Sequence, residues 1–164
     1  MNKQILLEHI LIKLDSLRQQ AIAAAMQAYN TATAEENVAE NKYDTLGLEA
    51  AYLAQGQAKR VAECEADIAA FKHLSVECIF DQIPISVGAL IQIVDEHESE
   101  QFLFLGPKAG GLSFMYAEES FNKEIKIITP TSPIGAALLK REAGEEFELK
   151  VGDNVHFYEI VSVC

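Results

Sequence analysis

The chain has 164 residues, and its 25 acidic against 13 basic side chains give a formal charge of −12. A chain of this length can bury a core as one domain or as two small ones. Proteins that bind DNA by themselves normally carry a basic surface, because neutralising phosphates supplies most of the affinity, so binding to duplex DNA is not expected. The apolar run 5–14 is interrupted by charged residues, and the three cysteines lack Cys-x-x-Cys spacing. We therefore expect no membrane span and a cytoplasmic location.

Residues 1–74 contain no proline and predict two long antiparallel helices packed as a coiled coil. Small and large apolar residues recur in the first helix at spacings of three and four, which is the pattern of a heptad seam. The return helix is expected to begin near residue 44 or 45, and Glu65 is expected to interrupt its seam. The predicted seam residues are Leu7, Ile10, Leu14, Leu17, Ala21, Ala24 and Ala28, then Ala51, Ala54, Ala58, Val61 and Ile68.

Acidic residues gather at the expected bend of this hairpin, near residues 36–42. Glu36 and Glu40 are four residues apart, which places both carboxylates on one side of a helical turn. Carboxylate pairs suit a hard cation such as Mg²⁺, which prefers oxygen ligands. The same acids also fit an ordinary solvated helix end. The acidic group comprises Glu35, Glu36, Glu40 and Asp44.

Residues 75–164 predict a small α+β domain with a mostly antiparallel sheet, because glycines and prolines separate short apolar runs. One short helix is expected to interrupt the strands, with Ser132 as N-cap, Pro133 at the first helical position and Ile134 on its apolar face. The serines and histidines have no nucleophile-elbow context, so a hydrolase acting alone is not expected. The expected strands are 89–94, 101–105, 112–116, 125–129, 146–150 and 155–163.

Two short stretches resemble a known family. Residues 128–139 read Ile-Thr-Pro-Thr-Ser-Pro-Ile-Gly-Ala-Ala-Leu-Leu, which is similar to the Ser-Pro-Ile-Ala-Arg-x-Leu motif of the Gre transcript-cleavage factors of bacterial RNA polymerase. Glu40 and Asn41 match the second acid and the asparagine of that family's Asp-Leu-Ser-Glu-Asn signature. The final hairpin of the sequence also follows the family pattern. In architecture, the resemblance covers essentially the whole chain.

The resemblance implies an FKBP-like fold for residues 75–164, docked at the rim of the secondary channel of RNA polymerase. It implies that the hairpin enters this channel and that its acids help to hold a Mg²⁺ ion of the polymerase. The chain would then be an elongation factor that acts on paused or backtracked complexes, lends residues to the cleavage activity of the polymerase and meets RNA only indirectly. The implied metal-facing residues are Glu36 and Glu40, and the implied partner-binding residues are Asn41, Asp44, Ser132, Pro133 and Ile134.

The sequence departs from the family at two positions. Asn37 stands where the family has its first tip acid, and Ala136 stands where the motif has arginine. These differences favour, as an alternative, a secondary-channel regulator that modulates or inhibits transcription without cleavage. Two other readings are an FKBP-like prolyl isomerase with a coiled-coil arm, and a purely structural or chaperone-like hairpin.

Overall fold

The structure, a computed structural model, describes residues 2–34, 46–74, 84–118 and 121–164. These residues divide into two compact units: residues 10–69 form one, and residues 1–9 together with 70–164 form the other. The expected division after residue 74 therefore does not coincide with the compact units, because the ends of both long helices group with the sheet. Among the described helices, none is long and apolar enough to cross a membrane.

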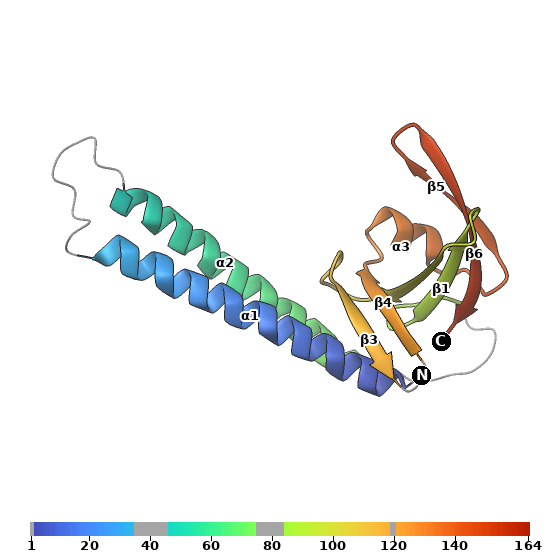
Figure 1. The fold of residues 1–164 in the computed structure, drawn as a ribbon, viewed down its shortest axis with the longest axis horizontal. Helices are drawn as coiled ribbons and strands as arrows, with labels where there is room; N and C mark the ends of the chain where they lie inside the picture. Colours follow the sequence, from blue (N-terminus) through green and yellow to red (C-terminus); the bar gives the residue numbers. More distant parts are fainter. Residues whose placement is uncertain (1, 35–45, 75–83, 119–120) are drawn as a thin grey trace. The chain divides into compact units, whose positions relative to one another are not determined.

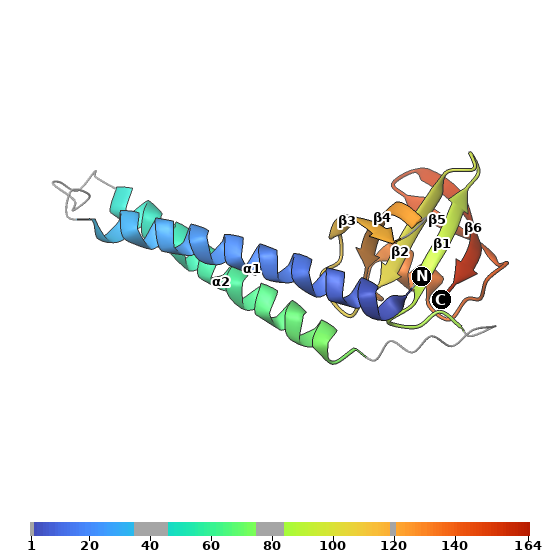
Figure 2. The same cartoon turned by 60° about the horizontal axis from the view of Figure 1, so that its bottom comes forward.

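Two long helices form the expected hairpin. Helix α1 (Lys3–Thr33) and helix α2 (Leu46–Lys72) run antiparallel and side by side (Figures 1 and 2). Of the residues expected in the seam of α1, Ile10 (0% exposed), Leu14 (1%), Ala21 and Ala28 are buried. Leu7, Leu17 and Ala24 are half-buried. The predicted helical hairpin is thus confirmed.

The predicted seam of α2 was wrong by one residue in its distal part. Ala51 and Ala58 are exposed, whereas Ala50 and Cys64 are buried, and Glu65 points to solvent rather than interrupting the seam. Alanines at positions 50, 51, 54, 58 and 62 surround this helix, so apolarity alone does not select one face. The buried residues Ala50, Cys64 and Phe71 lie fourteen and then seven residues apart, which is a heptad register.

The second unit contains a six-stranded sheet in the order β3-β4-β2-β1-β6-β5 among the described residues. All six predicted strands are confirmed. The pairing is antiparallel except between β2 and β4, which are parallel, so a mostly antiparallel sheet is also confirmed. The strands are β1 (Leu90–Asp95), β2 (Glu100–Leu105), β3 (Ser113–Glu118), β4 (Phe121–Ile128), β5 (Glu146–Val151) and β6 (Asn154–Val163).

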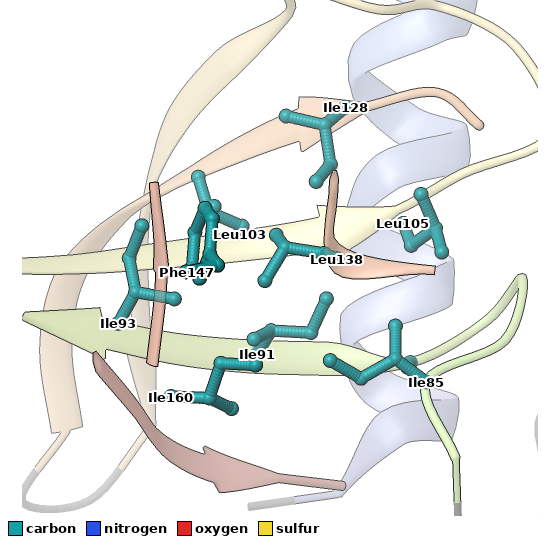
Figure 3. Close-up of a cluster of buried hydrophobic side chains, with 10 residues drawn as sticks. Ile85, Ile91, Ile93, Leu103, Leu105, Ile128, Leu138, Phe147 and Ile160 are labelled. Atoms are coloured by element: carbon teal, nitrogen blue, oxygen red, sulfur yellow. The ribbon is translucent and has the colours of Figure 1, made fainter. Parts of the chain in front are cut away.

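One face of the sheet, called here the α3 face, packs against helix α3 (Pro133–Leu138). Figure 3 shows Leu138 among the strand residues of this cluster. Alternate residues of each strand point to this face, as strand geometry requires. Leu138 brings the helix into the cluster and is fully buried. The cluster consists of Ile85, Ala89, Ile91, Ile93, Leu103, Leu105, Ile128, Leu138, Phe147 and Ile160.

The opposite face, called here the helix-end face, is covered in part by the ends of the two long helices. Phe71 of α2 stacks on Phe104 with ring centroids 6.3 Å apart, and His9 of α1 meets Tyr116 edge-on at 5.1 Å. Gly106 allows the close approach of α2, because a Cβ there would lie 2.8 Å from Phe71 Cζ. This explains why the helix ends belong to the same compact unit as the sheet.

Candidate functional site at helix α3

The structure describes three of the residues that the sequence marks as a site, and it brings them together at the start of α3. Ser132, Pro133 and Ile134 are consecutive residues of the turn and first helical turn. The hairpin residues Glu36, Glu40, Asn41 and Asp44 lie outside the described residues. In the part of the chain that the structure describes, no group of three or more His, Cys, Asp or Glu side chains could hold a metal ion.

Ser132 builds the start of α3. Its hydroxyl donates to the Thr129 carbonyl at 2.7 Å and accepts from the Gly135 amide at 3.2 Å, which is the N-cap predicted from the sequence. Its own amide donates to the same Thr129 carbonyl at 2.9 Å, closing a tight turn over Pro130. The Ser132 hydroxyl is therefore used within the chain, and it positions the surface around it.

Gly135 makes room for this turn. A Cβ built at Gly135 would overlap the Thr129 carbonyl oxygen and lie 2.9 Å from Ser132 Oγ. No side chain fits there without moving the backbone of the turn. Sequence reasoning did not single out Thr129 or Gly135, although the Thr-Pro dipeptide is a turn signal that could have located the first of them.

Helix α3 has an inner and an outer side. Ile134 is half-buried and packs against the cluster of the α3 face, and Leu138 is buried in it. Pro133, Ala136 and Lys140 are exposed. Of the expected partner-binding residues at this helix, Pro133 is thus the one at the surface. The outer side is small and nearly neutral, with one lysine at its end.

Arg141, which follows the helix, is not free to replace the arginine of the family motif. Its Nε donates to the Ala137 carbonyl at 2.8 Å, and its Nη1 donates to the Glu145 carboxylate at 3.2 Å and to the Glu146 carbonyl at 3.0 Å. These bonds hold the guanidinium against the start of β5. Lys140 has a positive φ of 70° and is the exposed cation beside Ala136.

Backbone hydrogen bonds fix the end of α3 to the segment that precedes the sheet. The Lys140 amide donates to the Ile85 carbonyl at 2.9 Å, and the Ile85 amide donates to the Arg141 carbonyl at 2.8 Å. Ile85 is itself in the core cluster. Hydrogen bonds therefore hold α3 at both of its ends, which suits a binding surface.

A second polar group ties the start of α1 to β3. Glu118 Oε2 accepts from the Asn2 amide at 3.1 Å and from the Tyr116 hydroxyl at 3.0 Å. The Asn2 bond, followed by the Tyr116 bond, lowers the pKa of Glu118. Burial, followed by the Glu118 carboxylate, raises the pKa of Tyr116 to about 12. These groups join the helix end to the sheet.

A shallow groove also runs along the distal part of the hairpin. Its volume is about 230 Å³, and its lining is small, apolar and amide-bearing. The groove lies where small alanine side chains in the seam do not fill the space between the two helices. The lining residues are Ala24, Gln27, Ala28, Thr31, Ala50, Leu53 and Gln57.

Comparison with known proteins places these features in a family context. Residues 112–164, which begin one residue before β3, match the family model described as "Transcription elongation factor, GreA/GreB, C-term". This segment contains the Ser132 turn and α3. The chain is also 27% identical to transcription elongation factor GreA of Desulfovibrio desulfuricans over 96% of this chain and 86% of that protein. Identity to GreA of Thermodesulfovibrio yellowstonii is again 27%, over 92% and 87% of the two chains.

Two solved structures are similar at a lower level. The GreA factor homolog 1 (Gfh1) of Thermus thermophilus is 16% identical, with 94% of each chain covered and a TM-score of 0.39. A GreA/GreB elongation factor from Nitrosomonas europaea is 26% identical, with 60% of this chain and 74% of that chain covered and a TM-score of 0.37.

Proposed function

We propose that the chain is a transcription elongation factor of the GreA/GreB family, which binds RNA polymerase through its secondary channel and acts on paused or backtracked complexes. The observation that carries the proposal is the match of residues 112–164 to the family's C-terminal segment, because α3 and its Ser132 turn lie within it. The chain acts in the cytoplasm as an accessory factor, and the catalytic centre is that of the polymerase.

In this proposal the exposed side of α3 docks on the polymerase and the hairpin delivers its bend to the active centre. Glu40, with Glu36 four residues before it, supplies carboxylate oxygens of the kind that Mg²⁺ prefers. The metal would be shared with the polymerase. A net negative bend is also attracted towards a site that holds divalent cations.

The first experiment measures RNA cleavage in a stalled elongation complex. Wild type is compared with Glu40→Gln, which removes the charge while keeping the side-chain size, and with Glu65→Gln, an exposed α2 residue, as matched control. The expected result is cleavage with wild type and with Glu65→Gln, and its loss with Glu40→Gln. Binding of every variant to purified polymerase is measured in parallel.

The outcome separates two functions within the family. Asn37 stands at the position of the first family acid, which favours a factor that modulates transcription without stimulating cleavage as the second candidate. Polymerase binding without cleavage by wild type would establish this second function. Absence of polymerase binding would reject the proposal as a whole.

Docking through α3 is tested separately. Ala136→Glu places a charge on the exposed side of the helix, and Glu142→Gln changes an exposed residue beyond its end. We expect Ala136→Glu to weaken polymerase binding while the circular dichroism spectrum and unfolding curve stay unchanged. Equal binding by both variants would mean that another surface docks.

A further inference from the structure

Among the residues that the structure describes, part of the helix-end face carries exposed apolar side chains. On β6, Phe157 is 55% and Val155 43% exposed. Phe157 stands opposite Glu148 and Val155 opposite Lys150, while Glu159 stands opposite both Val94 of β1 and Glu146 of β5. Directly opposite residues in antiparallel strands share a face, so these side chains form one surface. We name this surface the acidic-rimmed patch; it comprises Val94, Glu146, Glu148, Lys150, Val155, Phe157 and Glu159.

Carboxylates outnumber cations in the acidic-rimmed patch. Within the described part of the chain, Glu146, Glu148 and Glu159 take part in no ion pair, whereas Glu100, further along the same face, pairs with Lys123 at 3.0 Å. Glu146 and Glu159 stand directly opposite each other, an arrangement in which like charges destabilise a sheet. With three carboxylates against the single ammonium of Lys150, the rim around the exposed aromatic ring has a net negative charge.

We infer that the acidic-rimmed patch binds a basic amphipathic helix of a partner protein. The apolar centre needs an apolar partner, and the carboxylates need Lys or Arg around it, because a cationic rim would neutralise the charges that now repel. Val155 and Phe157 are two residues apart on one strand, about 6–7 Å. Side chains three or four apart on a helix are spaced by about 5–6 Å, so two successive apolar residues of a helix can meet both. Nucleic acid and acidic lipid would be repelled by the same rim.

The inference goes beyond the proposed function, because it uses neither the hairpin bend nor the exposed side of α3. Its test uses the full chain and a synthetic helical peptide of about five turns, with leucines along one face and lysines beside them. A second peptide of equal length carries glutamate in place of each lysine. Binding is measured by fluorescence anisotropy and mapped by backbone amide shifts. We expect the lysine peptide to bind and to shift β5 and β6, and the glutamate peptide not to bind.

Substitutions distinguish binding of the lysine peptide at the acidic-rimmed patch from a general electrostatic attraction between the peptide and the acidic chain. Phe157→Ser should weaken binding of the lysine peptide by roughly tenfold or more, as expected for a central aromatic anchor. Met115→Ser, on β3 and 61% exposed, removes an equally exposed apolar residue elsewhere and should leave binding unchanged. Both side chains are exposed, so neither change is expected to unfold the domain, and an unfolding curve of each variant checks this.

The rim is tested by two double variants that remove the same charge. Glu146→Gln with Glu159→Gln should weaken binding several-fold, and the loss should shrink at high salt. Glu124→Gln with Glu142→Gln, at exposed positions outside the patch, should have no effect. Equal weakening by both double variants, unchanged binding by Phe157→Ser, or no binding of the lysine peptide would each overturn the inference.

Discussion

The helix-end face of the sheet has two halves. Apolar side chains alternate along the strands of both halves, but they are buried in one half and exposed in the other. On β2, β3 and β4 it presents Phe104, Tyr116 and Ile127, which are all 0% exposed. On β5 and β6 the same face presents Phe157, which is 55% exposed. The covered half lies beneath Phe71 and the start of α1, and the open half is the acidic-rimmed patch.

The two halves differ in whether their carboxylates have hydrogen-bond partners. In the covered half, the carboxylates accept hydrogen bonds. Glu118 accepts from the Tyr116 hydroxyl and the Asn2 amide, and Glu100 accepts from the Lys123 ammonium. In the open half the carboxylates have no such bonds within the described residues. Burying unpaired carboxylates would be costly, so no element of this chain can cover that half without supplying cations. A cover for the open half must therefore come with positive charge.

The sharpest test of this comparison replaces one aromatic in each half. Phe71→Ala removes a fully buried ring from the covered half and should lower the free energy of unfolding by about 3–5 kcal/mol. Phe157→Ala, in the open half, should change it by no more than about 0.5 kcal/mol. Urea unfolding of the full chain, followed by circular dichroism, measures both. Similar losses would mean that the open half is buried in solution.

The α3 face offers a second comparison, because its cover depends on a turn as well as on apolar contacts. Gly135→Ala would force the Thr129 carbonyl away from the helix, and overpacking of this kind costs about 1–3 kcal/mol. The expected change is a lower midpoint of thermal unfolding. Ala136→Ser, one residue further on and exposed, is the control and should leave the midpoint nearly unchanged. If the midpoint of thermal unfolding is unaltered in Gly135→Ala, the backbone of the turn can move to accommodate the added Cβ at no cost.

Much of this architecture could be predicted from the sequence, because local signals carry it. Alternating strands, glycine and proline punctuation and the Ser-Pro pair at residues 132 and 133 gave six strands and the capped helix α3. The α2 seam could not be placed, since alanines on several faces leave the heptad register undefined until Cys64 and Phe71 are known to be buried.

The division of the helix-end face was beyond prediction for a different reason. It depends on contacts between segments far apart in the chain, such as Phe71 with Phe104 and Asn2 with Glu118. Local periodicity assigns Phe104 and Phe157 the same alternating pattern and cannot tell which will be covered. In the candidate site, Ser132 was predicted as a cap, but the engagement of Arg141 with the start of β5 depends on tertiary contacts and was not.

A pH dependence follows from the polar group in the covered half. Tyr116 has its pKa raised to about 12 from an ordinary value of 10, so the unfolded chain loses this proton first. Stability from Tyr116 is therefore complete below pH 10 and is lost as the pH rises towards 12. Urea unfolding at several alkaline pH values should show this decline in wild type and in Tyr52→Phe, whose tyrosine is 67% exposed.

Tyr116→Phe should remove this component of the alkaline loss of stability, and an unchanged loss would assign it to other groups.

At acid pH the pH dependence of stability has the opposite sign. The pKa of Glu118 is lowered by its bonds to Asn2 and Tyr116, so its contribution is present above the ordinary carboxyl range and is lost as the pH falls through its depressed pKa. Tyr116→Phe should make this acid limb shallower as well, because one of the two bonds is gone.

The smallest expected effect concerns the repulsion within the open half. Glu159→Gln removes one of two carboxylates that stand directly opposite each other and should raise the free energy of unfolding by about 0.2–1 kcal/mol. Glu148→Gln, opposite Phe157, removes an equal charge without a cross-strand partner of like sign and should change stability less. Urea unfolding at low and high salt distinguishes them, because the gain for Glu159→Gln should shrink as salt screens the pair. A loss of stability in Glu159→Gln would mean that Glu159 is held by an attractive contact, and the rim would then not be available to a basic partner.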